Sequence, residues 1–185
     1  MSPNRKEEIL AGTLEAFDAT GAIAIDEIRR RSGASVGSIY HHFGDQEGIA
    51  AALYVEVLRE YQAGVIATLK RRTGAEEGVK ALVRHHLRWV ERHPQRARFL
   101  AQSGGARLAA GDELKPLNRE LSASVGDWVG SRPEIRPLRS EVFYAAALGP
   151  AQELARLWLA GRIPSLRKLE DELAEAAWRA IRVGD

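Results

Sequence analysis

The chain contains no cysteine and no long apolar run. Without cysteine, a disulfide framework, a cysteine-ligated zinc site and a thiol nucleophile are all excluded. No stretch approaches 18 consecutive apolar residues, and the first residues lack the apolar segment of a secretory signal, so we expect neither a transmembrane helix nor secretion. With 45% hydrophobic and 28% charged residues over a length of 185, the composition predicts a folded globular protein of the cytoplasm.

The chain also lacks a strong charge of either sign, and the charge that it has is unevenly distributed. There are 27 Lys and Arg against 25 Asp and Glu, a formal net charge of +2. Residues 1–50 hold five basic and eight acidic side chains, a net charge of −3, whereas the remainder carries +5. Charge alone therefore argues against a nucleic-acid contact by the first 50 residues, because Lys and Arg favour binding to phosphates.

The spacing of apolar residues is helical almost throughout, and no segment shows the alternation of a strand. Leu10, Leu14 and Phe17, for example, fall on one face of a helix. Glycine, proline and capping residues mark the breaks between such segments. We predict about nine helices, over residues 3–20, 26–32, 36–42, 45–72, 76–92, 95–110, 113–129, 139–160 and 165–183.

These helices predict an all-α chain with two domains. A three-helix domain would occupy residues 1–48 and contain a helix-turn-helix. A larger C-terminal helical bundle would occupy residues 49–185 and serve ligand sensing and dimerisation. The long helix over residues 45–72 would connect the two.

The most informative stretch, residues 26–49, predicts the helix-turn-helix itself. Gly33 suits the tight turn because glycine tolerates a positive φ, and Ser35 can cap the second helix. The apolar face of that helix is formed by Val36, Ile39 and Phe43. Its other face is small or able to form hydrogen bonds, with Gly37, Ser38 and His41. A slim helix with a polar face is what the major groove of DNA admits.

Residues 33–49 read Gly-Ala-Ser-Val-Gly-Ser-Ile-Tyr-His-His-Phe-Gly-Asp-Gln-Glu-Gly-Ile. This segment resembles the TetR family signature, in which G-V-S-x-G-x-L-Y-x-H-F is followed by x-S-K-E-x-L. The resemblance covers about residues 5–60. Its identities are Phe17, Gly21, Gly33, Ser35, Gly37, Tyr40, His42, Phe43 and Glu47.

The resemblance implies a homodimeric DNA-binding transcriptional regulator, most often a repressor, which a small-molecule ligand releases from a palindromic operator. The helix over residues 36–42 would be the recognition helix. By family position, Ser35, Tyr40 and His42 would hold phosphates. Bases would be contacted by Val36, Ser38 and His41. The predicted DNA-binding set is completed by Gly37 and Gln46.

The sequence departs from the family pattern where phosphate contacts are expected. Ile23 and Ala24 stand where the family has Ser or Thr near the second helix, and Gln46 replaces the usual Lys. A glutamine can still donate a hydrogen bond to a phosphate, but it adds no charge. Together with the net charge of −3, these changes predict weaker nonspecific DNA binding and a shallower salt dependence than in a basic relative.

The C-terminal part is rich in large apolar side chains, and all four tryptophans lie beyond residue 80. They could line an apolar ligand cavity or simply fill the core. For the ligand pocket we predict Trp89, Phe99, Trp128 and Tyr144.

The last two predicted helices carry apolar stripes that predict a four-helix dimer interface across a two-fold axis, although the stripes could equally pack within the subunit. The predicted interface residues are Phe143, Ala147, Leu154, Leu157, Trp158, Leu169, Leu173 and Ala177.

Catalysis and metal binding find little support in the sequence. There is no nucleophile elbow, phosphate-binding loop, dinucleotide fingerprint or zinc-protease motif, so we predict no enzyme and no cofactor. The pairs His41-His42 and His85-His86 are adjacent on helices, where neighbouring side chains point about 100° apart, so neither pair alone can chelate one ion. An alternative function stays open: a helical small-molecule-binding or adaptor protein of the same fold that has lost DNA binding.

Overall fold

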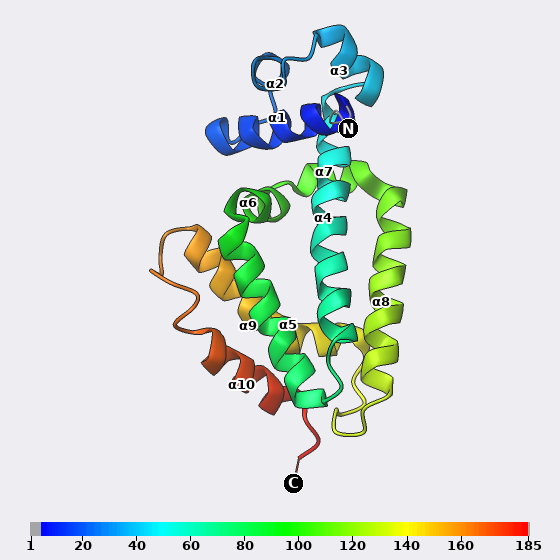
Figure 1. Ribbon diagram of the computed structural model, residues 1–185, viewed down its shortest axis with the longest axis vertical. Helices are drawn as coiled ribbons and strands as arrows, with labels where there is room; N and C mark the ends of the chain where they lie inside the picture. The colour runs from blue at the N-terminus through cyan, green and yellow to red at the C-terminus, as the bar shows by residue number, and fades with distance from the viewer. Residues whose placement is uncertain (1–4, 185) are drawn as a thin grey trace. The chain divides into compact units, whose positions relative to one another are not determined.

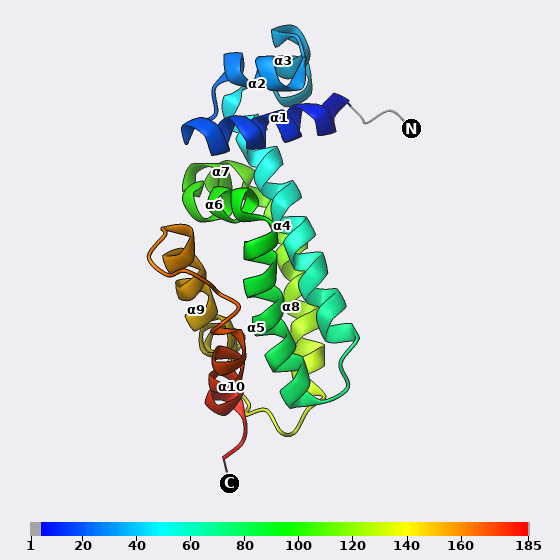
Figure 2. The same ribbon diagram turned by 60° about the vertical axis from the view of Figure 1, so that its left-hand side comes forward.

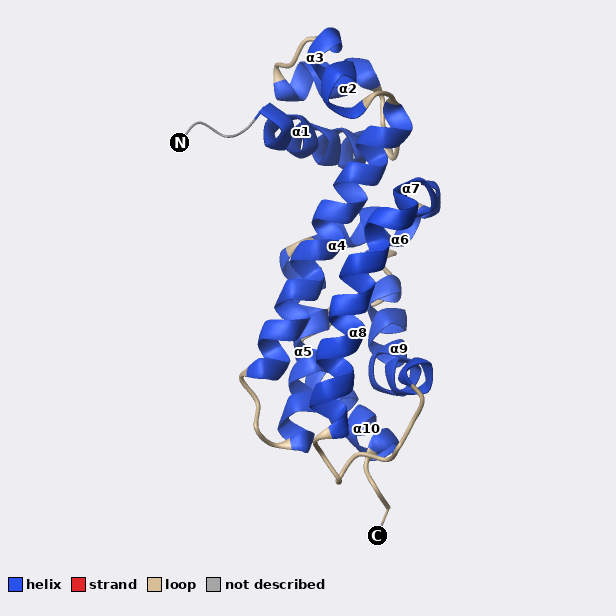
Figure 3. Cartoon of the chain, turned by 90° about the vertical axis from the view of Figure 1, so that its right-hand side faces the viewer, coloured by secondary structure: helices blue, strands red, loops and turns tan. Residues whose placement is uncertain are grey.

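The computed structural model describes residues 5–184, and helices joined by turns and short irregular connections account for most of them (Figure 3). Within this part of the chain there are ten α-helices and one short 3-10 helix. The α-helices are α1 Arg5–Thr20, α2 Ile25–Ser32, α3 Val36–Phe43, α4 Gln46–Lys70, α5 Ala75–Arg92, α6 Pro94–Gln102, α7 Gly104–Ala110, α8 Leu114–Gly130, α9 Ser140–Leu159 and α10 Glu170–Ile181. The 3-10 helix spans Gly111–Glu113.

The predicted all-α fold is confirmed, with one addition to the predicted helices. The helix expected over residues 95–110 is divided into α6 and α7 at Ser103, whose φ of −94° and ψ of 55° leave the helical region. Two glycines follow it, and glycine weakens a helix interior because it loses more backbone freedom than other residues. No helix among the described residues is both long enough and apolar enough to cross a membrane.

The final helix begins later than predicted. Helix α10 starts at Glu170, whereas the apolar stripe suggested residue 165. Residues 161–169 form turns instead, and Pro164 lies among them. Leu166 is nevertheless fully buried, so its position in the apolar stripe reflects an anchored turn and not a helical face.

The described chain divides into two compact units that are not contiguous in sequence. One contains residues up to 59 together with 95–116, and the other contains 60–94 together with the residues from 117 onward. The boundary therefore differs from the predicted division after residue 48. Side chains of α1 explain why α6 joins the first unit: Asp18 accepts hydrogen bonds from Gln95 at 2.8 Å and Arg98 at 3.0 Å.

In the first unit, α1, α2 and α3 lie together, as the blue helices of Figure 1 show. Isoleucines from α1, α2 and α3 are completely buried and form the centre of this small core, namely Ile9, Ile28 and Ile39. Phe17 of α1 meets Phe99 of α6 edge-on, with the ring centroids 5.1 Å apart. Burial of these apolar side chains is the main source of stability for such a unit.

In the second unit, α5, α9 and α10 pack against one another (Figure 2). The buried face of α5 is apolar, with Val79, Leu82, Val83 and Leu87. Its more exposed side pairs with acidic residues of α10, since Arg84 lies 2.8 Å from Asp171 and Arg88 lies 2.6 Å from Glu170. Exposed pairs of this kind contribute little free energy each, but they fix the register of the two helices.

Trp128 of α8 packs directly on the backbone of α5 at Gly78. A Cβ atom placed on Gly78 would overlap the indole ring. The ring is held from two other sides: its Nε1 donates to the carbonyl oxygen of Arg72 at 3.3 Å, and the Arg132 guanidinium lies 3.8 Å from its centroid. Gly78 is therefore required by close packing.

We predict that Gly78→Ala lowers the free energy of unfolding by about 1–3 kcal/mol, because the Trp128 ring must move to admit the methyl group. Gly126→Ala in α8 is the matched control, since a Cβ there would meet no atom within 4 Å. That change should raise stability by about 0.5–1 kcal/mol, the helix preference of alanine over glycine. Urea unfolding measures both, and equal midpoints for Gly78→Ala and the parent would contradict this packing.

Candidate nucleic-acid interface and ligand cavity

The turn between α2 and α3 has the geometry that its sequence predicts. Gly33 ends α2 in the left-handed region with φ +66°, and its N–H donates to the carbonyl oxygen of Arg29 at 3.0 Å. The Ser35 hydroxyl accepts a hydrogen bond from the backbone N–H of Ser38 at 3.1 Å, which caps α3. The turn role of Gly33 and the capping role of Ser35 are therefore confirmed.

Helix α3 buries one residue completely, Ile39, and leaves most of the predicted contact set exposed. The exposed members are Ser35, Val36, Gly37, Tyr40, His41, His42 and Gln46, and Ser38 is half-buried. Val36 was expected on the buried apolar face, but 39% of its surface is exposed, beside Tyr40 one turn later at 44%. As the first residue of α3, Val36 lies at the edge of the packed face, so the structure places it on the open side of the helix.

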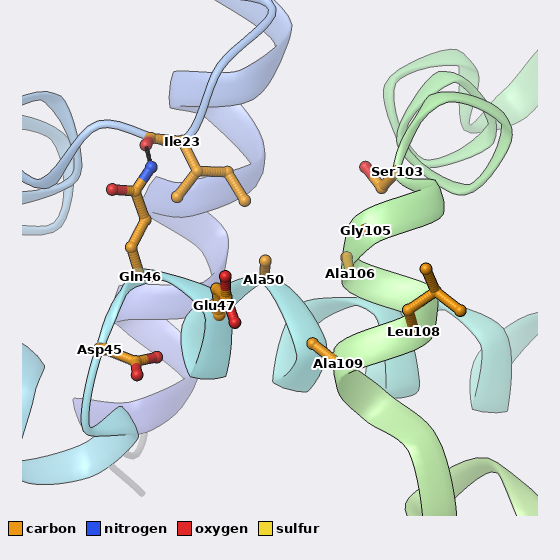
Figure 4. A pocket seen from close by; sticks show the side chains of 10 residues that line it. All are labelled: Ile23, Asp45, Gln46, Glu47, Ala50, Ser103, Gly105, Ala106, Leu108 and Ala109. Carbon is orange, nitrogen blue, oxygen red and sulfur yellow. Dashed lines mark hydrogen bonds between the residues drawn. The ribbon is translucent and has the colours of Figure 1, made fainter.

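The start of α4 is fixed to its surroundings by two polar side chains. Asp45 accepts a hydrogen bond from the N–H of Gly48 at 2.7 Å and so caps the start of α4. The Gln46 amide donates to the carbonyl oxygen of Ile23, as the dashed line in Figure 4 shows. An amide nitrogen carries two hydrogens, so only one remains for the phosphate contact predicted for Gln46.

The arginines of α2 are largely neutralised within the unit. Glu27 accepts hydrogen bonds from Arg30 at 3.0 and 2.5 Å and from Arg31 at 2.7 Å. These bonds, first to Arg30 and then to Arg31, lower the pKa of the Glu27 carboxyl. Arg29 is engaged more weakly, since its Nε lies 4.0 Å from the highly exposed Asp26.

A cavity of about 950 Å³ lies within the first unit, between the start of α4 and α7 (Figure 4). Its charged lining is acidic, with Asp45 and Glu47 on one wall, and α7 contributes small side chains and Leu108 on the other. None of the four residues predicted for the ligand pocket lines it. Because the space is open and its carboxylates are exposed, it does not resemble an enclosed apolar ligand site.

The four predicted pocket residues do not come together as one site. Phe99 belongs to the core of the first unit, where it packs against Phe17 and Tyr54. Trp128 rests on Gly78, as described above. Trp89 and Tyr144 both lie in the second unit, and each has a buried polar atom without a hydrogen-bond partner among the described residues. Sequence spacing did not separate these cases because all four are large and apolar.

A cluster of aromatic and imidazole rings lies in the second unit around Tyr61 of α4. Its hydroxyl lies 2.9 Å from His86 Nδ1, and its ring meets Trp89 with the centroids 4.9 Å apart. Four buried polar atoms near or within this cluster lack a protein partner: His85 Nε2, His86 Nε2, Trp89 Nε1 and Tyr144 Oη. Tyr61 and His86 are 25 residues apart, so only the adjacent pair His85-His86 gave a hint in the sequence.

This cluster is uncharged near neutral pH. Burial lowers the pKa of His86 to about 4, with a further small effect of the neighbouring His85. Burial also raises the pKa of Tyr61, and the proximity of Tyr144 raises it further. The interior of the second unit therefore offers hydrogen-bonding groups without a net charge.

A more enclosed cavity of about 460 Å³ lies in the second unit, among the end of α8, the connection after it and the start of α9. Phe143 and Tyr144 line it from α9, and Arg132 and Arg136 line it from the connection. Among the predicted pocket residues, only Tyr144 lines this space. No cluster of three possible metal ligands occurs anywhere between residues 5 and 184.

The residues predicted for the dimer interface fall into two groups. Phe143, Ala147 and Ala177 are buried inside the subunit, so they are not available at its surface. The half-buried members are Leu154, Leu157, Trp158, Leu169 and Leu173. Part of the predicted apolar stripe therefore packs within the subunit, where α9 and α10 contact α5.

Residues 9–53 match the family model described as bacterial regulatory proteins of the tetR family. The HTH-type transcriptional regulator BetI from Burkholderia mallei is 30% identical over 82 residues, which are 43% of this chain and 40% of BetI. The match therefore spans less than half the length of this curated relative.

Solved structures resemble nearly the whole chain. A TetR family transcription regulator from Marinobacter aquaeolei VT8 has a TM-score of 0.80 at 17% identity, covering 97% of this chain and 96% of that one. FadR from Bacillus subtilis, solved in complex with stearoyl-CoA, has a TM-score of 0.76 at 17% identity, covering 95% and 98%. At such identities the likeness establishes the fold alone. Residues 9–53 are thus similar to the tetR family of bacterial regulatory proteins, and the chain has the fold of solved TetR family regulators.

Proposed function

We propose that the protein is a dimeric, cytoplasmic DNA-binding repressor that a small-molecule ligand releases from a palindromic operator. The observation that carries this proposal is the open face of α3, capped at Ser35 and exposing Val36 and Tyr40 after a left-handed turn. A two-fold dimer presents two such helices to half-sites about one DNA turn apart, or a multiple of it.

On this proposal, DNA affinity depends more on hydroxyls, backbone amides and shape than on lysine and arginine. Tyr40 and His42 would donate to phosphates, and the Val36 side chain would contact a thymine methyl group. The N-terminus of α3 adds a partial positive charge without any basic side chain. The pairing of Arg30 and Arg31 with Glu27 is consistent with this division, and it also favours the alternative of a ligand-binding protein without DNA binding.

The second unit would hold the effector. The FadR structure of similar fold contains stearoyl-CoA, which shows that this fold accommodates a ligand in that protein. A ligand that prefers one separation of the two recognition helices would shift the population of dimers away from the spacing that fits the operator. Helix α4 suits transmission of this change because its residues 46–59 belong to the first unit and 60–70 to the second.

Selection of bound sequences from random duplexes at low salt tests the proposal directly. We expect a palindromic consensus, and the affinity of the winning duplex should then be measured at several salt concentrations. Failure to enrich any sequence would contradict DNA binding and favour the alternative function. Enrichment of a site without two-fold symmetry would contradict the dimeric mode.

We predict that Tyr40→Phe and His42→Ala each weaken binding to the selected duplex about tenfold, because each removes a hydrogen bond to a charged phosphate. Helical content by circular dichroism should stay unchanged, since both side chains are exposed. Gln102→Ala, an exposed change at the end of α6, is the control and should bind like the parent. Parental affinity in either test variant would remove that residue from the interface.

Glu27→Gln should strengthen nonspecific DNA binding, because Arg30 and Arg31 lose their carboxylate partner. The slope of log affinity against log salt should steepen by about 0.9 for each guanidinium that then reaches a phosphate. Asp26→Asn changes the net charge equally but frees only a pair at 4.0 Å, so its effect should be smaller. Equal effects of the two variants would mean that net charge, and not the local pairing, sets the affinity.

Dimerisation through α9 and α10 is tested by Leu173→Glu, which places a charge on a half-buried apolar side chain of α10. We expect monomers in sedimentation velocity, with helical content retained. Gln102→Glu adds the same charge to the first unit and should leave the dimer intact. A Leu173→Glu variant that sediments as the parental dimer would place the interface elsewhere.

A further inference from the structure

The less open cavity, in the second unit, combines an apolar wall with cationic groups. Val125 and Val129 of α8, Ile135 of the connection and Phe143 of α9 form much of its apolar lining. Its only charged lining residues are Arg132 and Arg136, and no carboxylate lines it. The size, about 460 Å³, falls within the usual range of small-molecule sites.

Both arginines are held by neutral groups. Arg132 donates to the carbonyl oxygens of Trp128 at 2.5 Å and Arg72 at 3.0 Å, and its buried Nε has no partner. Arg136 donates to the carbonyl oxygen of Ala180. Among the described residues, neither guanidinium lies within 4.0 Å of a carboxylate oxygen. Their charges are thus fixed in place without an ion pair to any carboxylate between residues 5 and 184.

The start of α9 adds to this positive field. Ser140, the first residue of α9, lines the same cavity. The N-terminus of a 20-residue helix carries a partial positive charge, so an anion beside it is stabilised. Tyr144, one turn further along α9, also lines the cavity. The cluster around Tyr61 and His86 is uncharged because burial disfavours the ionised forms.

We infer that this cavity binds an anionic amphiphile of medium length, a carboxylate whose headgroup pairs with Arg136 in the field of Arg132 and whose hydrocarbon chain lies against the apolar lining. The inference rests on the proposed function, because it names the chemical class of the effector. A carboxylate supplies the counter-charge that the two guanidiniums lack, and its chain gains free energy by leaving water. An alcohol of the same length satisfies only the apolar lining, and a cationic chain is repelled.

Isothermal titration of the full-length protein with three ten-carbon probes tests the ligand class. The probes are decanoate, 1-decanol and decyltrimethylammonium, which share a chain and differ in headgroup charge. We expect decanoate to bind about tenfold more tightly than decanol, and the cationic probe to bind least. Equal affinity of decanoate and decanol, preference for the cation, or binding of none of the three would each overturn the inference.

Two variants locate the site. Arg136→Gln should weaken decanoate about tenfold and leave decanol unchanged, whereas Arg139→Gln removes an equal charge outside the cavity lining and should bind like the parent. Gly126→Leu should block both probes while folding normally, because Gly126 lines the cavity and a Cβ there meets no atom within 4 Å. Parental decanoate affinity in Arg136→Gln or Gly126→Leu would place the ligand elsewhere and overturn the inference.

The outcome is separable from the proposed function. If the selected duplex binds but decanoate does not, the inference fails and the regulator remains. If decanoate binds in the manner described but no duplex is enriched, the ligand class stands and DNA binding fails. Release of the duplex by decanoate in the parent, but not in Arg136→Gln at the same concentration, would support both.

Discussion

The left-handed backbone at Gly33 is the constraint on which the exposed face of α3 depends. It ends α2 abruptly, so that Ser35 lies in position to cap the next helix. With the start of α3 fixed in this way, Ile39 enters the core and its opposite face turns outward. A residue with a Cβ at position 33 would adopt this φ only with strain. The proposed recognition surface therefore follows from the geometry of a single turn.

Features with a local cause could be predicted from the sequence, and features that depend on distant packing could not. The turn at Gly33 and the caps at Ser35 and Asp45 involve residues within three or four positions of each other. The union of α6 with the first unit, in contrast, depends on contacts of Asp18 with residues some 80 positions away. Periodicity describes one helix at a time, so it could not show which helices form a unit.

The same limit applies to the candidate ligand site. Residue size and apolar character predicted a shared pocket, but they did not distinguish Phe99 in the first core from Trp89 beside Tyr61. The cavity is lined by a connection without regular structure, residues 131–139, whose arginines had no helical pattern to draw attention to them. The fold brings these two guanidiniums beside an apolar wall in a cavity whose lining contains no carboxylate.

The two units differ in how their arginine side chains are bonded. In the first unit, Arg30, Arg31 and Arg98 form ion pairs with acidic side chains. In the second, Arg132 and Arg136 donate to backbone carbonyl oxygens. A net charge of +2 thus conceals two different uses of arginine, structural neutralisation near α2 and a localised positive field beside α9.

This difference has a mechanistic consequence for a regulator. An anion that settles beside Arg136 changes the charge balance of the second unit without touching the helix-turn-helix. Tyr144 lines that cavity, and it belongs to the same unit as Tyr61 of α4. Helix α4 runs without a break from Gln46 to Tyr61 and beyond. The Gln46 amide donates to the carbonyl oxygen of Ile23, just before α2. A displacement of α4 at Tyr61 can therefore be transmitted along the helix to the residues that position α3. Coupling of this kind needs no contact between effector and DNA, only two arrangements of α4 that the ligand and the operator prefer differently.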